Sequence, residues 1–213
     1  YINNVDDKKI TLSKTAFGAS GWLETVQSEL AFRFTNDDFF LAAHQWLRLS
    51  VLPRFGLTGS EPCVCGDKTP SRMPYRCNDA HILNCGALNT FTSRHENVNM
   101  VFADCARSVK LVPQLPPKPI PNSKLRPDLL VPDAAVGVHL LCDTAIVNAC
   151  ANNGATDTHT VQLRNGDNKA AAKHKKYLGV LLPGQRFNAL VLETNGGLTR
   201  AVREFVSTMA TRA

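Results

Sequence analysis

The sequence lacks any apolar run long enough to cross a bilayer, because no stretch approaches the roughly 18 to 20 apolar residues that a membrane helix needs. It begins YINNVDDKKI, with neither an initiator methionine nor the apolar core of a secretory signal. We therefore expect a piece of a longer protein that does not span a membrane. The seven cysteines are an odd number in a chain without an export signal, which favours a reducing compartment over a disulfide framework.

Internal repeats and the composition of a disordered or fibrous chain are absent as well. The 213 residues are 44% hydrophobic and 20% charged, which is ordinary for a soluble protein. A chain of this length can bury a core as one domain or as a domain with an appendage.

Positive charge is concentrated after residue 60. Residues 1–60 contain six Lys/Arg and six Asp/Glu, so the net charge of +6 arises from the remainder of the chain. Six bases and a single acid, Asp167, lie between Arg164 and Arg186. Such a cluster is more often a solvated surface, and it is also typical of a surface that binds phosphate.

Hydrophobic spacing predicts helices in the first half of the chain. Apolar residues recur at helical intervals over 22–32 and 36–52, which predicts two packed helices. The pattern returns over 92–109, and the residues of its predicted buried stripe are Val98, Val101, Phe102, Cys105 and Val109. Segment 112–124 has five prolines in thirteen residues, so it can be neither a helix nor a central strand.

The second half of the chain alternates short β-branched runs with helical segments. The predicted elements are strands over 126–132, 136–149 and 186–195, a loop or irregular hairpin over 152–168, and helices over 167–182 and 198–213. The predicted inward residues of the last helix are Leu198, Val202, Phe205, Val206 and Met209. The order helix, strand, strand, helix, strand, helix predicts an α/β domain with a small mixed sheet.

The densest set of metal-binding side chains lies in the stretch PCVCGDKTPSRMPYRCNDAHILNC, residues 62 to 85. Cys63 and Cys65 are two residues apart before a glycine, and His81 and Cys85 are four apart, so one helical turn could direct both at one centre. Three thiolates and an imidazole suit tetrahedral Zn²⁺. Cys77 is an alternative ligand, and buried structural cysteines beside a surface histidine are the competing interpretation.

Two aspartates form a second candidate metal site. Asp128 stands at the start of a predicted strand, and Asp143 lies inside the next apolar strand, where an isolated carboxylate is costly to bury. Carboxylates on neighbouring strands could together hold Mg²⁺. Each aspartate could instead be a turn or capping residue, and the lysine-rich helix that follows is what favours the metal site.

A succession of short motifs gives the chain a family resemblance. In order they are QWLRLSVLP, CVCG, HILNC, RHENV, RPDLLV, CDTAIV, KHKKY and FNALVLETNGGL, between about residues 38 and 199. Their order resembles the C-terminal region of site-specific non-LTR retrotransposon proteins, where a Cys/His knuckle precedes a restriction-like endonuclease of the PD-(D/E)xK superfamily. Together with the predicted helices, the resemblance divides the chain into a helical linker segment over 1–60, a zinc knuckle over 61–90 and an expected restriction-endonuclease-like domain over 91–213.

The resemblance also implies roles for individual residues. It makes Asp128 and Asp143 the catalytic pair that holds Mg²⁺, and it places the catalytic lysine in the following helix, because no lysine follows Asp143 in the strand. The corresponding K-x-x-K-Y pattern consists of Lys173, Lys176 and Tyr177. Lys173 would orient the attacking water or offset charge at the phosphate, and the other two would contact the flanking phosphate or complete the site.

The activity implied by the resemblance is nicking of target DNA to prime reverse transcription. Its partners would be double-stranded DNA, a reverse-transcriptase domain upstream and, as a further candidate, the element RNA, in the nucleus. DNA contacts are expected from Arg126, Lys169 and Lys175, whereas Arg94 and His95 would bridge the knuckle and the nuclease or contact DNA. Two alternatives stay open: an inactive nucleic-acid-binding module with a structural zinc, and a protein-interaction scaffold.

Overall fold

The computed structural model describes residues 43–44, 49–65, 76–82, 85, 90–133, 137–149, 160–194 and 196–213. These residues fall into two compact units, one before residue 94 and one from Arg94 onward. The predicted helix over 22–32 lies outside the described residues; of the helix predicted over 36–52, residues 43–44 are helical and 49–51 are not. No helix among the described residues combines the length and the apolar character that crossing a membrane would require.

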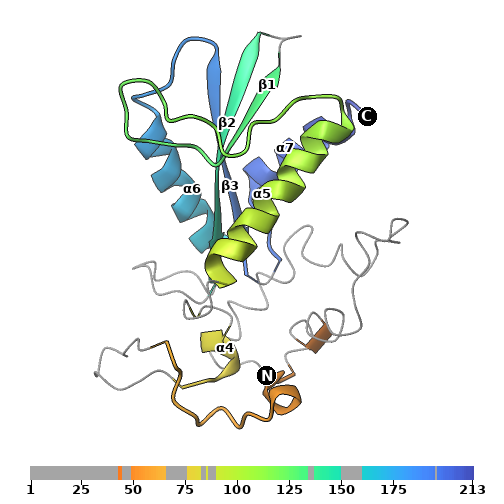
Figure 1. The fold of residues 1–213 in the computed structure, drawn as a ribbon, viewed down its shortest axis with the longest axis vertical. Helices are drawn as coiled ribbons and strands as arrows, with labels where there is room; N and C mark the ends of the chain where they lie inside the picture. The colour runs from red at the N-terminus through yellow and green to blue at the C-terminus, as the bar shows by residue number, and fades with distance from the viewer. Residues whose placement is uncertain are drawn as a thin grey trace. The chain divides into compact units, whose positions relative to one another are not determined.

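From residue 90 onward, the described part of the chain contains three helices and a three-stranded sheet (Figure 1). The elements are α5 (Thr90–Ser108), β1 (Leu129–Asp133), β2 (Val138–Val147), α6 (Arg164–Tyr177), β3 (Gln185–Glu193) and α7 (Arg200–Ala210). β1 pairs antiparallel with β2, and β2 pairs parallel with β3, so the sheet is mixed and β2 is its central strand. The predicted order of elements and the small mixed sheet are confirmed.

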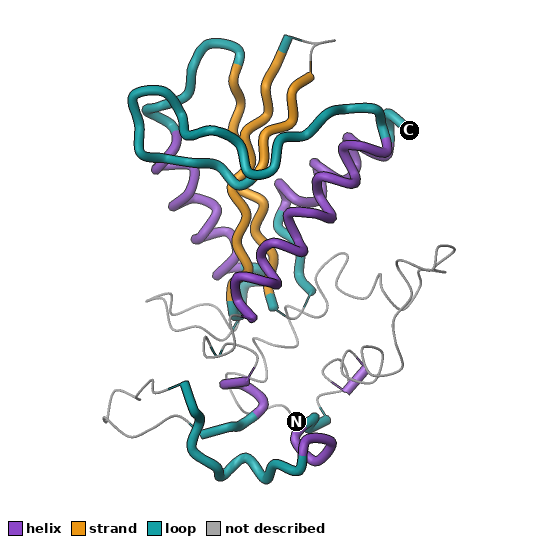
Figure 2. Tube along the Cα trace, viewed as in Figure 1, coloured by secondary structure: helices purple, strands orange, loops and turns teal. Residues whose placement is uncertain are grey.

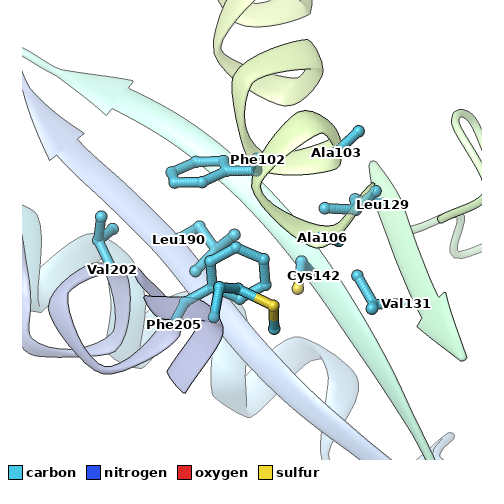
Figure 3. Packing of buried hydrophobic residues seen from close by; sticks show 10 residues of the cluster. Phe102, Ala103, Ala106, Leu129, Val131, Cys142, Leu190, Val202 and Phe205 are labelled. Carbon is cyan, nitrogen blue, oxygen red and sulfur yellow. The ribbon is translucent and has the colours of Figure 1, made fainter. Parts of the chain in front are cut away.

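Helices cover both faces of this sheet. α5 and α7 pack on one face, where the rings of Phe102 and Phe205 meet edge to face with centroids 5.5 Å apart. Figure 3 shows these two rings beside Leu190 of β3. α6 packs on the other face, where the ring of Tyr177 stacks on that of Phe187 at 4.3 Å. The sheet is therefore the middle layer of three, and β2 is buried from both sides.

Two valines depart from the predicted buried stripes. The buried residues of α7 are Val202, Phe205 and Met209, as predicted. Val206 of α7, however, is 41% exposed, and Val101 of α5 is 54% exposed. Each of these valines is next in sequence to a buried phenylalanine. Because neighbouring helical residues point about 100° apart, the phenylalanine takes the sheet-facing direction and the valine turns outward.

The proline-rich segment connects α5 to β1 without forming a helix or a named strand, as predicted. Figure 2 shows this loop running from the end of α5 toward α6 and back to β1. Ile120 of the loop packs in the core beneath α6, and Tyr177 of α6 donates its hydroxyl hydrogen bond to the carbonyl of Arg126 at 3.0 Å. The Arg126 side chain in turn donates from Nε to the carbonyl of Pro117 at 3.0 Å. These contacts fix the approach of the chain to β1.

α6 begins earlier than the sequence predicts. Residues 164–166, expected only in the loop over 152–168, lie in its first turn. The buried side chain of Asn165 donates from Nδ2 to the carbonyls of Asn148 and Ala149, at 3.1 and 2.9 Å. Contacts with the end of β2 thus hold a helical turn whose asparagine and glycine have weak intrinsic helix propensity.

A Cys/His cluster and a carboxylate site

Four metal-binding side chains converge in the unit that precedes residue 94. The ligand atoms of Cys63, Cys65, His81 and Cys85 all lie within 4.8 Å of one another. The Sγ atoms of Cys63 and Cys85 are 3.5 Å apart, and Cys65 Sγ is 3.4 Å from His81 Nε2. The structure brings together the ligand set that the sequence predicted. Because three thiols and an imidazole match the ligands of tetrahedral zinc sites, this cluster could bind zinc.

Hydrogen bonds within short turns position both halves of the cluster. Before the first cysteine pair, the Glu61 carboxylate accepts hydrogen bonds from the hydroxyl of Thr58 at 2.7 Å and from the N–H of Gly59 at 2.9 Å. These donors, led by the Thr58 side chain, lower the pKa of Glu61 to about 2. His81 lies in α4 (Asp79–Ile82), and its N–H donates to Oδ1 of Asn78 at 2.8 Å. Local hydrogen bonds therefore shape the turn before Cys63 and the turn that carries His81.

The Cys63 thiol is predisposed to ionise. A hydrogen bond from the backbone of Cys65 is the main cause that lowers the pKa of Cys63 to about 6, with a smaller contribution from Cys85. The thiolate is the form that binds metal. Cys77 differs, because burial raises the pKa of its thiol, which donates to the carbonyl of Pro62 at 3.8 Å. Cys77 is not in the converging group.

In the unit from Arg94 onward, Asp128 and Asp143 stand opposite each other across two strands. Leu129 of β1 pairs with Cys142 of β2, so the residue before Leu129 faces the residue after Cys142. The N–H of Asp128 donates to the carbonyl of Cys142 at 2.9 Å, which continues the strand pairing. Burial, together with the neighbouring carboxyl of Asp143, raises the pKa of Asp128. The two predicted carboxyls therefore form a close pair.

Lys173 of α6 reaches this pair from the next helix. Its Nζ lies 2.8 Å from Oδ2 of Asp143, and the two side chains are only 13% and 9% exposed. An ammonium partner offsets the cost of burying the Asp143 carboxylate. Lys169 and Lys175, on the same helix, are exposed. α6 thus directs one lysine inward and presents others to solvent.

Tyr177 and Lys176, the other predicted site residues of α6, differ in burial. Tyr177, one turn after Lys173, is fully buried, and its phenol is committed to the Arg126 carbonyl. Burial and the nearby carboxylate of Asp143 raise the pKa of Tyr177, so the phenol stays protonated. Lys176 is exposed, and its Nζ lies 5.4 Å from the centre of the Tyr177 ring. Contacts of these residues with phosphate or DNA stay predictions.

His95 occupies a place that the sequence did not reveal. Its Nε2 lies 3.2 Å from Oδ2 of Asp128 and 3.3 Å from the carbonyl oxygen of Thr144. Its Nδ1 lies 3.3 Å from Nδ2 of Asn99, a residue that sequence analysis missed. The spacing of four residues on α5 is the only sequence signal linking His95 to Asn99. Arg94 is half-buried, and burial lowers its pKa.

No protein-family model and no curated protein sequence matches this chain. The resemblance to non-LTR retrotransposon proteins rests on the order of the short motifs and stays a prediction. The chemistry of the two sites follows from the side chains that converge there.

Proposed function

We propose that the chain carries a Mg²⁺-dependent DNA endonuclease, a restriction-endonuclease-like domain that follows a zinc knuckle, as in non-LTR retrotransposon proteins. The observation that supports this proposal most directly is the contact of Lys173 with Asp143, beside Asp128. Two carboxyls and one ammonium group then meet in one place. These are the groups that the family resemblance assigns to phosphodiester hydrolysis.

The donor set fits a magnesium ion. Asp128 and Asp143 supply carboxylate oxygens, the ligands that Mg²⁺ prefers, from two strands whose pairing holds them side by side. The raised pKa of Asp128 reflects burial and a neighbouring carboxyl, and both costs would be offset by a cation held between the two groups. Bound Mg²⁺ would supply Lewis-acid stabilisation of charge on the scissile phosphate.

The side chains of the protein would bind the metal ion, position the reactants and contact the DNA. Asp128 and Asp143 would hold the ion, and Lys173 would orient the attacking water or offset the negative charge that develops on the phosphate. Its contact with Asp143 keeps the ammonium in place before substrate binds. The exposed Lys169 and Lys175 of α6 would contact the DNA backbone, which makes affinity dependent on salt.

The biological setting follows from the resemblance alone. The nick would leave a 3′-hydroxyl from which a reverse-transcriptase domain of the same protein primes DNA synthesis on the element RNA. The target would be double-stranded DNA in the nucleus.

Nicking of supercoiled plasmid tests the activity. We expect wild-type protein to nick in Mg²⁺ and not in the presence of a chelator, and Asp128→Asn to lose nicking while retaining DNA binding. Asp104→Asn is the matched control, because this carboxylate is exposed on α5 and pairs only locally with Arg107. Nicking by Asp128→Asn at the wild-type rate would refute the assignment.

A nucleic-acid-binding module or scaffold with a structural zinc is the second candidate. One observation favours it: among the residues that the structure describes, only the Cys/His cluster brings three or more metal-binding side chains together. Binding of DNA without nicking in Mg²⁺ would support the binding module. Failure to bind any nucleic acid at low salt would support the scaffold.

A further inference from the structure

The ring of His95 lies between hydrogen-bonding groups whose chemistry defines its proton positions. Nε2 is 3.3 Å from the carbonyl oxygen of Thr144, an atom that can only accept a hydrogen bond. Nε2 must therefore carry a proton and donate. The same nitrogen is 3.2 Å from Oδ2 of Asp128, a second acceptor.

The other ring nitrogen faces a donor. Nδ1 lies 3.3 Å from Nδ2 of Asn99, an amide nitrogen that can only donate. With the amide in this orientation Nδ1 accepts, and the ring proton that faces the two oxygens lies on Nε2. Asn99 is buried, which keeps water from competing for this contact. If the Asn99 amide were reversed, its oxygen would face Nδ1 and require a doubly protonated ring.

The donors converge on one oxygen of the Asp128 carboxylate. Oδ2 accepts from the N–H of Thr144 at 2.7 Å and from Nε2 of His95 at 3.2 Å. Two donors that come from different elements, β2 and α5, hold this oxygen of the carboxylate in place. Oδ1 is the oxygen that these donors leave unengaged.

We propose that Asn99 and His95 form a positioning relay for Asp128, in which Asn99 holds the ring of His95 through Nδ1 and His95 holds the carboxylate for a divalent cation. This relay rests on the proposed nuclease function and deepens it. It gives His95 the role of a hydrogen-bond donor to Asp128, in place of a DNA contact or a bridge to the knuckle. Groups that orient metal ligands in this way are typically worth about 10- to 100-fold in metal affinity or activity.

The tautomer can be tested without metal or DNA. We expect ¹⁵N NMR of the full chain labelled at histidine to show His95 protonated at Nε2 and not at Nδ1, with the signal assigned by its loss in His95→Gln. Asn99→Leu, which removes the donor to Nδ1, should keep the proton on Nε2 and shift the ¹⁵N signal of Nδ1. A ring protonated at Nδ1, or at both nitrogens, in the wild type would overturn the relay.

Magnesium binding tests the second half of the relay. In a Mg²⁺ titration followed by the NMR signals of the Asp128 and Asp143 carboxyls, we expect His95→Ala to weaken binding about 10- to 100-fold. His95→Gln, which keeps an N–H donor, should recover most of the affinity. Met100→Ala is the control, because Met100 is 45% exposed on the same helix. If His95→Ala does not fold, Asn99→Leu makes the same comparison with the imidazole present.

Nicking assays separate the relay from the proposed function. We expect His95→Ala to need about 10- to 100-fold more Mg²⁺ for half-maximal nicking, with unchanged DNA affinity. Wild-type Mg²⁺ dependence in His95→Ala, with Asp128→Asn inactive, would overturn the relay and leave the nuclease intact. Failure of the wild type to nick, with the expected tautomer and Mg²⁺ binding, would refute the nuclease and leave the relay intact.

Discussion

Lys173 contacts the carboxylate of Asp143 from a different element, because the lysine lies on α6 and the aspartate on β2. The residue two positions after Asp143 in the strand is Ala145, which packs against the core beneath α6. A lysine at that strand position would have to replace this apolar contact. The position of the ammonium group therefore depends on how α6 docks on the sheet.

We expect Lys173→Ala to abolish nicking and to leave DNA binding nearly intact, whereas Lys175→Ala should weaken binding modestly and keep nicking. The reason is direction: Lys175 lies about 200° around the helix from Lys173 and is exposed. Plasmid nicking and DNA-binding titrations measure the two effects. Removing one partner of a buried pair costs about 3–5 kcal/mol, so circular dichroism must first show that Lys173→Ala is folded. An inactive Lys175→Ala beside an active Lys173→Ala would contradict the assignment.

Purified protein should contain about one Zn²⁺ per chain, because thiolate ligands couple metal binding to folding. Cys85→Ser should lower both the zinc content and the midpoint of thermal unfolding. Cys77→Ser is the control, since Cys77 lies outside the converging group, and it should keep the metal. Metal analysis and thermal unfolding measure both. Unchanged zinc content in Cys85→Ser, or loss of zinc in Cys77→Ser, would show that the ligand set is wrong.

Gly166→Ala should destabilise the protein, although alanine favours helices by about 1 kcal/mol over glycine. A Cβ at position 166 would lie 2.9 Å from Cγ2 of Thr199. Thr199 is buried, and its hydroxyl donates to the carbonyl of Val191, so it cannot easily move aside. Overpacking of this kind costs about 1–3 kcal/mol. Gly179→Ala, with open space around its Cβ, should be close to neutral in chemical denaturation. Equal effects of the two substitutions would contradict the predicted clash.

The Glu61 carboxyl should titrate in the folded protein with a midpoint of about 2, below its usual 4.5, because Thr58 and Gly59 donate to the ionised form. A lowered folded-state pKa contributes stability that is fully present above the unfolded value and is lost as the pH falls through about 2. Thr58→Val, which removes the hydroxyl donor, should raise the midpoint. NMR of the side-chain carboxyl measures it, and an unchanged midpoint in Thr58→Val would exclude this hydrogen bond as the cause.

The helices whose bounds were predicted well are those that bury one continuous face. α5 and α7 present a stripe to the sheet, so helical periodicity places both within a few residues of their observed bounds. The start of α6 was not predictable in this way, because the hydrogen bonds of Asn165 to the end of β2 hold its first turn. Tertiary contacts there override a local sequence that favours a loop.

The candidate sites also include some contacts that sequence spacing predicts and others that depend on tertiary packing. The metal ligands come in two pairs that are close in sequence, Cys63 with Cys65 and His81 with Cys85. Their spacing alone therefore predicted a shared metal site. His95 and Asp128 are 33 residues apart, and no periodicity links them. They come into contact because the N-terminal part of α5 lies beside the start of β1 in the folded chain. Sequence patterns do not predict this packing.

The central position of β2 has a consequence for how the site is lost on heating. Asp143 lies on β2, a strand that is paired along both edges and covered on both faces. The backbone amide protons of β2 should therefore exchange with solvent only when the whole domain opens. Asp128 is hydrogen bonded to the same strand. The carboxyl pair therefore belongs to the last cooperative unit to open, and its separation should coincide with global unfolding.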